Sequence, residues 1–491
     1  MSESSWRESD SYNELEPISL LFNEMPPLEE TKNSSQESSV GDRRRRKAAV
    51  VFVVIWSSTI ALHLVTWGSW LIFGLTALMG FHAVRILLAR PLTDAEPLSL
   101  DQPQALPFIS VLVAAKNEQA VIGRLVSMLC NLDYPSSRYE IWVIDDNSTD
   151  QTPHLLQQLS QQYPHLRVFQ RLPGATGGKS GALNQVLPLT QGEIIAVFDA
   201  DAQVAPDMLR RVVSLFERPG LGAVQVRKAI ANGSANLLTY GQVAEMALDV
   251  YFQQQRIAIG GIGELRGNGQ FVRRLALDEC GGWNEETITD DLDLTIRLHL
   301  GQWDIDCLTF PAVQEEGVTR PIALWHQRNR WAEGGYQRYL DYWRPILRNR
   351  MGTGKTIDLL MFWITQYILP TAAIPDFLMA VLRHRPLLYT PIASLTVSLS
   401  IIGMMTGLQQ IRRQQYAITK ENQAEEVAVS DLPLFQAKAS LLVGLLHALI
   451  GTLYMFHWVP VMASTTARMA IRPKRLKWVK TVHEGSEHPA A

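Results

Sequence analysis

Two aspartates one residue apart, Asp199 and Asp201, end an apolar stretch that begins at Ile194. Residues two apart in a β-strand point to the same side, so both carboxylates would leave the strand end together. Two convergent carboxylates suit a hard divalent cation that also binds phosphate oxygens. Acids with this spacing also occur in ordinary solvated turns, so their meaning depends on the other motifs of the chain.

A second acidic pair, Asp145 and Asp146, follows an earlier apolar run and precedes Asn147 and Ser148. A carboxylate at this position could accept the imide N–H of uracil, and its neighbour could hold ribose or a metal. The same segment could instead cap a helix, because Asn, Ser and Asp accept hydrogen bonds from the first N–H groups of helices. Both interpretations stay open at this point.

A glycine-rich stretch around Lys179 resembles a P-loop only in part. The P-loop spacing requires glycine at position 173, where this chain has Pro173. A lysine in such a loop could still pair with a diphosphate. The alternative is a flexible surface loop without a ligand.

Two later motifs add a candidate base and a candidate phosphate ligand. Asp290 and Asp291 precede a segment of helical periodicity. One of these carboxylates could take a proton from an acceptor hydroxyl, although acids also stabilise a helix start through its dipole. Gln327, Arg330 and Trp331 lie in another helical stretch. Arginine can bind phosphate through two parallel hydrogen bonds, and tryptophan can support a sugar or lipid headgroup or anchor the chain beside a membrane.

Strands that alternate with helices provide the scaffold for these motifs. The expected strands are 109–115, 141–144, 166–170, 194–198 and 222–226, with helices at 121–132 and 155–162. This alternation predicts a mostly parallel sheet. Ligands of such sheets bind outside the carboxyl ends of the strands, where Asn117, Glu118 and the two aspartate pairs would meet.

Apolar segments flank the α/β region. Residues 1–42 are polar and acid-rich, which predicts a disordered tail. Residues 43–90 hold five consecutive cations and then two apolar stretches, each about long enough to cross a bilayer. Cations before the first span place the N-terminus in the cytoplasm. Since the two spans form a hairpin, we expect residues 90–355 on the cytoplasmic side as well.

The segment 355–465 is apolar again, and 387–408 and 441–462 are candidate spans. The stretch 357–382 contains two prolines and two aspartates. An aspartate at the bilayer centre costs about 2.5–3.5 kcal/mol, so we expect this stretch to lie along the interface. Four spans would then keep the basic tail 466–491 in the cytoplasm. Five spans, with the tail outside, are the alternative.

Bulk composition agrees with an intracellular enzyme domain. The chain has 491 residues and a net charge of -3, and we expect no nucleic-acid partner. Its three cysteines, Cys130, Cys280 and Cys307, show no CxxC spacing. They are therefore expected to be reduced thiols rather than disulfides or zinc ligands.

The motifs occur in the order Asn117-Glu118, Asp145-Asp146, Asp199-x-Asp201, Thr289-Asp290-Asp291 and Gln327-x-x-Arg330-Trp331. This ordered set resembles the inverting glycosyltransferases of family 2, in the membrane-embedded branch that includes cellulose and hyaluronan synthases. Each motif is weak alone, but their order and spacing are specific. The resemblance covers about residues 105–345 and implies a GT-A nucleotide-sugar domain inserted between N- and C-terminal transmembrane helices.

The resemblance also implies roles for the motifs of the first half. Asp146 would contact uracil and Asp199 the nucleotide sugar. Asp201 would bind Mg²⁺ or Mn²⁺. Lys179 is similar to the basic residue of the loop after the third strand in this family.

In the second half, the resemblance implies that Asp291 is the catalytic base. Arg330 would bind the diphosphate and Trp331 would lie at the acceptor. The family usually has Thr-Glu-Asp where this chain has Asp290, but the second carboxylate is retained, so Asp291 keeps the assignment. The remaining substrate-binding candidates are Asn117, Glu118, Asp145, Asp290 and Gln327.

Within that branch, the layout resembles cyanobacterial enzymes that transfer glucose from UDP-glucose to diacylglycerol. A membrane lipid can approach sideways, whereas a growing polymer needs a channel, for which four or five spans provide a thin wall. The alternatives are a polysaccharide synthase, a polyprenyl-phosphate sugar transferase or, in a different class, a membrane transporter or receptor with an inactive α/β domain. The motifs fix neither the donor sugar nor the oligomeric state.

Overall fold

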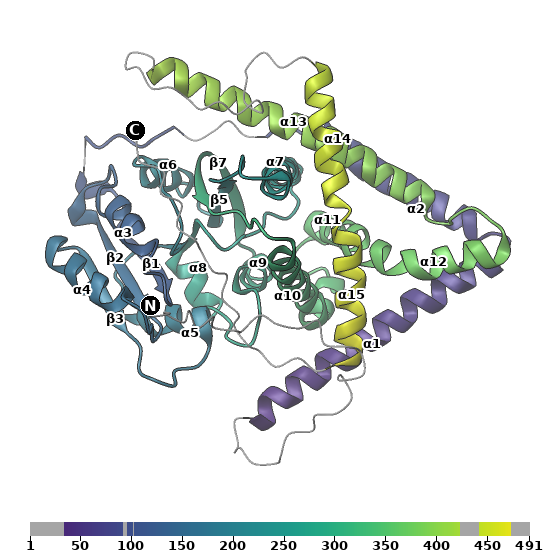
Figure 1. Ribbon diagram of the computed structural model, residues 1–491, viewed down its shortest axis with the longest axis horizontal. Coiled ribbons are helices and arrows are strands. Elements are labelled where there is room, and N and C mark those ends of the chain that lie inside the picture. The colour runs from purple at the N-terminus through teal and green to yellow at the C-terminus, as the bar shows by residue number, and fades with distance from the viewer. Residues whose placement is uncertain (1–33, 92–95, 102, 423–440, 473–491) are drawn as a thin grey trace, which may run out of the picture.

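The computed structural model describes residues 34–91, 96–101, 103–422 and 441–472 (Figure 1). Most of the expected acidic tail lies outside the described residues. Helix α1 (Ser34–Leu64) begins before the boundary expected at residue 42. Most of the basic C-terminal tail, from residue 473 onward, also lies outside them.

A seven-stranded mixed sheet forms the centre of the domain, in the order β3-β2-β1-β4-β6-β5-β7. The strands are β1 (Ile109–Ala115), β2 (Tyr139–Asp145), β3 (Leu166–Gln170), β4 (Ile194–Asp199), β5 (Leu221–Ile230), β6 (Gln270–Arg273) and β7 (Asp304–Glu315). Only β6 is antiparallel to its neighbours, β4 and β5. The five expected strands are confirmed, whereas β6 and β7 were not predicted. With apolar helices on both sides in the sequence, the expected GT-A class of α/β domain is confirmed.

Helices cover both faces of this sheet. They are η2 (Pro103–Ala105), α3 (Ile122–Cys130), η3 (Ser136–Arg138), α4 (Thr152–Gln162), α5 (Gly178–Val186), η4 (Leu187–Leu189), α6 (Met208–Leu215), α7 (Leu237–Ala258), α8 (Arg274–Glu279), α9 (Asp290–Leu300) and α10 (Pro321–Leu347). The side chains of β1 alternate between the two faces, so Val111 packs with α3 and α6, while Leu112 packs with α5, α8 and α9. Burial on both faces explains the continuous apolar runs of the central strands.

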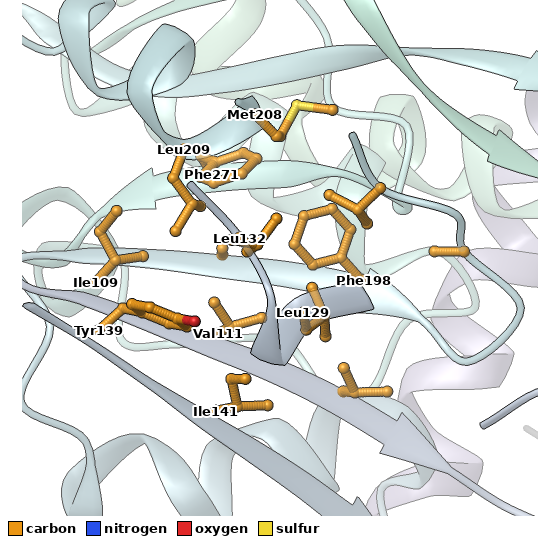
Figure 2. Close-up of a cluster of buried hydrophobic side chains, with 14 of the residues drawn as sticks. Ile109, Val111, Leu129, Leu132, Tyr139, Ile141, Phe198, Met208, Leu209 and Phe271 are labelled. Carbon is orange, nitrogen blue, oxygen red and sulfur yellow. The ribbon is translucent and has the colours of Figure 1, made fainter. Parts of the chain in front are cut away.

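The core under α3 is shown in Figure 2. Ile109 and Val111 of β1 meet Leu129 of α3, and all three are fully buried. The rings of Phe198 and Phe271 pack edge to face, with centroids 5.7 Å apart. This packing holds the carboxyl end of β4, next to which Asp199 and Asp201 lie. The three cysteines are reduced, as expected.

Five helical stretches of the described residues are long and apolar enough to cross a membrane, which identifies a membrane protein. They lie in α1, α2 (Gly68–Leu87), the continuous stretch α11 (Thr353–Trp363), η5 (Ile364–Ile368) and α12 (Leu369–Arg383), then α13 (Thr390–Asn422), and finally α14 (Leu441–Met455) with α15 (Trp458–Ile471). The π-helical segment η5 ends two residues before Pro370, which cannot donate a backbone hydrogen bond.

Helix α12 lies along α1 (Figure 1). The stretch Thr353–Arg383 is long and apolar enough to cross a membrane, so a crossing competes with the interfacial position predicted for residues 357–382. The two aspartates that motivated that expectation are both paired. Asp358 accepts a hydrogen bond from Arg256 Nε at 2.8 Å, and Asp376 lies 2.7 Å from His63 Nε2 of α1. Pairing offsets much of the cost of burying a carboxylate. No local pattern indicated these partners, because they come from distant segments of the chain.

A different helix pair, α14 with α15, crosses the other apolar helices (Figure 1). Helices α1, α12 and α13 converge where His63 meets Asp376 and where Tyr389 bonds to Thr59. By contrast, α15 packs on α1 at Ala48, and α14 packs on α13 at Met404. Both contacts are about 15 residues, or roughly 22 Å, from the converging ends. Because both contacts lie at the same distance from the converging ends, the pair α14–α15 runs across the bundle at a single depth, beside the sheet domain.

The charged end of α1 is attached to the sheet domain. Arg44 forms an ion pair with Asp341 of α10 at 2.7 Å, and Lys47 donates to the Leu340 carbonyl at 2.7 Å. The cations before the first span thus bind the domain in addition to indicating orientation. The N-terminal end of α1 and the domain must lie on the same side of the membrane.

This arrangement leads to a topology prediction. A cysteine introduced at His384, at the converging ends, should be labelled only from the side opposite the domain. A cysteine at Glu484 should be labelled from the same side as a reference cysteine at Gln161 of α4, which is exposed. Membrane-impermeant maleimide on intact and inverted vesicles, in a variant without native cysteines, measures both. Labelling of positions 484 and 384 both from the side opposite the domain would favour five spans, whereas labelling of both from the domain's side would favour the interfacial position of residues 357–382.

Candidate active site

The carboxyl end of the sheet opens into a cavity of about 2290 Å³ that continues between the apolar helices. Nine predicted site residues line it: Glu118, Lys179, Asp199, Asp201, Asp290, Asp291, Gln327, Arg330 and Trp331. They come from five separate segments, and the fold brings them together. Asn117, Asp145 and Asp146 are not in its wall and form a second, adjoining cluster.

Asp199 and Lys179 form the closest ion pair of the cavity. Lys179 in the first turn of α5 lies 2.5 Å from Asp199, and the Asp199 N–H donates to Asn268 Oδ1 at 3.2 Å. Burial alone would raise the pKa of Asp199, but the lysine outweighs it and holds that pKa below its usual value. The carboxylate therefore stays ionised and keeps Lys179 at the strand end, where a diphosphate could compete for it.

Asp201 lies just beyond β4 and supplies oxygen donors suited to a hard cation. Its Oδ2 accepts the Glu316 N–H at 3.3 Å. The described residues contain no group of three or more His, Cys, Asp or Glu side chains close enough to bind a metal by themselves. Magnesium usually takes one or two carboxylates and completes its shell with substrate phosphates and water. Asp201 beside Asp199 fits that type of site, in which the donor substrate supplies the remaining ligands.

Asp291 lies in the first turn of α9 and lines the cavity. Its Oδ1 accepts the N–H of Leu292 at 2.8 Å. Gly267 lies opposite Asp291 and has φ 84°, a left-handed conformation that favours glycine. Burial and the neighbouring Asp290 raise the pKa of Asp291 to about 6. A carboxylate with this pKa is a stronger base than an ordinary aspartate and is still ionised at neutral pH.

The raised pKa predicts a pH profile. If Asp291 must be ionised to act, kcat/KM should fall about tenfold per pH unit below roughly pH 6 and level off above it. Asp290→Asn removes the repulsion between the two acids and should move the inflection to lower pH. Initial rates between pH 4.5 and 8 test this. An inflection that stays in place in Asp290→Asn would exclude coupling between the two carboxylates.

Helix α10 presents the Gln327–Trp331 motif to the cavity. The Trp331 ring, which could support a sugar or lipid headgroup, is itself in contact with charged side chains of the protein. Two cations lie over the Trp331 ring, Arg328 at 4.1 Å and Lys228 at 5.2 Å from its centroid. The fully buried Arg328 also forms an ion pair with Glu245 of α7. Burial lowers the pKa of Arg330, which faces Asp199, Asp291 and Asp290. The motif thus places positive charge opposite the carboxylates.

The adjoining cluster is organised by Arg171, which the sequence did not single out. Its guanidinium donates to Asp146 at 2.6 Å and to the carbonyls of Thr176 and Gly178. Arg171 therefore links the Asp146 strand end to the glycine-rich loop before Lys179. The Oδ2 atom of the buried Asp145 has no hydrogen-bond partner among the described residues.

Asn117 connects the first strand to this cluster. It adopts φ 54°, in the left-handed region that asparagine tolerates better than most residues. Its N–H donates to Ser148 Oγ at 2.8 Å, and its Oδ1 accepts the Thr149 N–H at 2.7 Å. The Glu118 N–H donates to Thr152 Oγ1 at 2.8 Å. These contacts fix the loop after Asp146 and favour a positioning role for Asn117.

A second unpredicted pair, Lys228 and Glu315, lies at the ends of β5 and β7. The two side chains are 3.0 Å apart, and both line the cavity. Because β7 was not predicted, no sequence signal placed Glu315 next to Asn268 and Asp201. Only the prediction of a strand at 304–315 would have placed Glu315 beside Lys228.

Comparison with known proteins places these observations in context. The family described as glycosyl transferase family 2 matches residues 110–281. The chain is 61% identical over 489 residues to the beta-monoglucosyldiacylglycerol synthase of Trichormus variabilis, covering 99% of this chain and 100% of the relative. It is 53% identical over 491 residues to that of Synechocystis sp., covering 99% and 98%. Mannosyltransferase PcManGT from Pyrobaculum calidifontis, solved with GDP-Man and Mn²⁺, is 22% identical, with a TM-score of 0.48, and covers 76% of this chain and 100% of that one.

Proposed function

Because the chain belongs to glycosyltransferase family 2, we propose that it transfers glucose from UDP-glucose to 1,2-diacylglycerol and forms β-monoglucosyldiacylglycerol. The observation that carries this proposal is one cavity that joins the carboxylates at the sheet edge to a space between the apolar helices. Near-complete coverage of two beta-monoglucosyldiacylglycerol synthases at 53% and 61% identity supports the same activity. The enzyme would take a water-soluble donor and a membrane lipid into one site.

The reaction is a single displacement at the anomeric carbon. Asp291 accepts the proton of the diacylglycerol hydroxyl while that oxygen attacks the carbon, and the bond to the UDP oxygen breaks. Attack from the face opposite UDP converts the α-linkage of the donor to a β-glucoside. Arg330 and Lys179 lie where the diphosphate would collect negative charge, so they stabilise the leaving group. The raised pKa of Asp291 suits this general-base step.

Asp201 would bind Mg²⁺ or Mn²⁺ together with the diphosphate oxygens of the donor. Such an ion neutralises charge on the departing UDP. Asp199 would contact the nucleotide sugar. The cluster of Asn117, Glu118, Asp145 and Asp146 would hold the uridine, with Arg171 fixing the orientation of Asp146.

The domain would face the cytoplasm. The cations at 43–47 lie in α1 directly before its apolar part, and two of them bind α10, so the positive-inside rule for α1 applies directly to the domain. Trp331 and Gln327 would lie near the acceptor hydroxyl. Their position on α10, which packs against α15, places them at the level where the apolar helices leave the domain.

The structure offers less support for the alternatives. A polysaccharide synthase needs a passage through the membrane. Here the space between the helices ends at a packed apolar cluster that includes the buried Ile72 and Ile392. A transporter or receptor with an inactive domain would not need carboxylates at every expected position of the cavity.

The direct test uses the purified full-length protein in lipid nanodiscs with diacylglycerol and a panel of UDP-sugars. We expect one product, with the mass of a monohexosyl diacylglycerol, from UDP-glucose, and a β-anomeric proton signal by NMR. Transfer should require a divalent cation. A polymeric product, or transfer only to a polyprenyl phosphate, would overturn the proposal.

A further inference from the structure

The part of the cavity that lies between the apolar helices has its own walls. They come from α2, from α11 with η5, and from α13, and include Met79, Ala83, Met361, Thr365, Leu395 and Leu399. Helix α1 packs with α12 and helix α2 with α13, so this space lies between two helix pairs that diverge toward the domain (Figure 1). The whole cavity, at about 2290 Å³, exceeds the roughly 300–1,000 Å³ of ordinary small-molecule sites.

The deepest wall residue of this space lies about half a bilayer away from the level at which α14 crosses α13. Between Met404, where α14 crosses α13, and Leu395, the deepest α13 residue of the wall, the helix rises about nine residues, or roughly 14 Å. A bilayer has a hydrocarbon thickness of about 30 Å, so one leaflet provides about 15 Å. Beyond Leu395 the apolar cluster with Ile72 and Ile392 closes the space.

Charged side chains line the neck between this space and the carboxylates, and they are paired with one another. Arg256 donates to Asp358 at 2.8 Å, and Arg338 to Glu264 at 2.6 Å. His82 of α2 lies 3.2 Å from the same Asp358. An anionic headgroup would have to compete for these buried pairs, whereas an uncharged glycerol group would not. The neck therefore favours a neutral lipid.

We propose that this space is the acyl-chain site of the acceptor, which holds both chains of a neutral two-chain glycerolipid and points its hydroxyl through the neck toward Asp291. Gln366 and Ser400 in the wall offer donors to the ester carbonyls. The lipid enters sideways between the two helix pairs from the leaflet on the domain's side. The identity of the acceptor as diacylglycerol rests on the proposed function, but the location of the chains does not.

A matched pair of substitutions on α13 tests the site. Thr396 faces the cavity, whereas Ser398, two residues further along, is exposed on the opposite side of the helix. Thr396→Trp should raise the KM for dioleoylglycerol about tenfold, because the ring occupies the space of the chains. Ser398→Trp should leave KM nearly unchanged. Dioctanoylglycerol should be affected less by Thr396→Trp. Its short chains end near the level of Thr396, which lies roughly 12 Å along α13 from Met404.

Equal KM values for the two variants would overturn the proposal. UDP affinity, measured by calorimetry, should not change in either variant, which separates loss of the acyl site from loss of folding.

Photolabelling of the unmodified protein gives an independent result. A diacylglycerol with a diazirine in one acyl chain should crosslink to peptides that contain 361–366 and 395–400, and excess dioleoylglycerol should prevent it. Phosphatidic acid with the same chains should compete poorly. Crosslinks confined to the outer apolar faces, such as Phe73 of α2 or Phe377 of α12, would refute the site. If the wild-type protein proves to glycosylate another lipid, the proposed function fails, and a diazirine analogue of that lipid tests the acyl site separately.

Discussion

Asp291→Asn is expected to abolish glucosyl transfer while it leaves UDP binding nearly intact. The amide keeps the shape of the side chain and can still accept the Leu292 N–H, but it cannot take a proton from the acceptor. A general base contributes about 10²–10⁴-fold to the rate, so kcat should fall by at least the lower of these factors. Radiolabelled UDP-glucose in a single-turnover assay measures the loss, and calorimetry with UDP measures retained binding.

Asp290→Asn is the matched control for that experiment. It removes a carboxylate from the same cavity wall and should keep a substantial part of the activity at neutral pH. If Asp290→Asn were the inactive variant and Asp291→Asn stayed within a few-fold of wild type, the two roles would have to be exchanged.

Asp201→Ala should weaken donor binding as well as turnover, and only when the cation is present. Removal of even an outer-shell partner of a metal ligand typically costs about 10–100-fold in metal affinity, so loss of a ligand should cost at least as much. Titration of UDP with and without Mg²⁺ should therefore show a large magnesium effect in wild type and almost none in the variant.

Asp207→Ala provides the comparison, because Asp207 is a half-buried aspartate of the same region that pairs with Arg211. It should retain the full magnesium effect. An unchanged magnesium effect in Asp201→Ala would remove Asp201 from the metal site.

The sequence predicted those parts of the fold that local pattern controls. The bounds of β1 and β3 agree residue for residue, because each is an uninterrupted strand pattern between turn residues. The four-residue β6 is too short for a periodic signal. The edge strand β7 contains Pro311 and several polar residues, which argue against a strand when the sequence is considered alone.

The site was predictable where a motif carried the chemistry and not where tertiary contacts did. The carboxylates and the Arg330 motif line one cavity, as their order along the chain suggested. Arg171 was missed because nothing in its surroundings marks a partner 25 positions earlier. The cost of burying Asp376 was likewise estimated without its partner His63, because that residue lies on another helix.

The packed cluster with Ile72 and Ile392 that closes the space between the helices also has a consequence for the membrane as a whole. A product formed in a space that is closed at its far end would return to the half of the bilayer that supplied its acceptor. A glucosyl group does not cross hydrocarbon readily, because its hydroxyls would lose their hydrogen bonds to water. Synthesis would therefore generate compositional asymmetry and, through the larger headgroup, curvature stress. Glucolipid on the opposite surface would depend on a separate flippase.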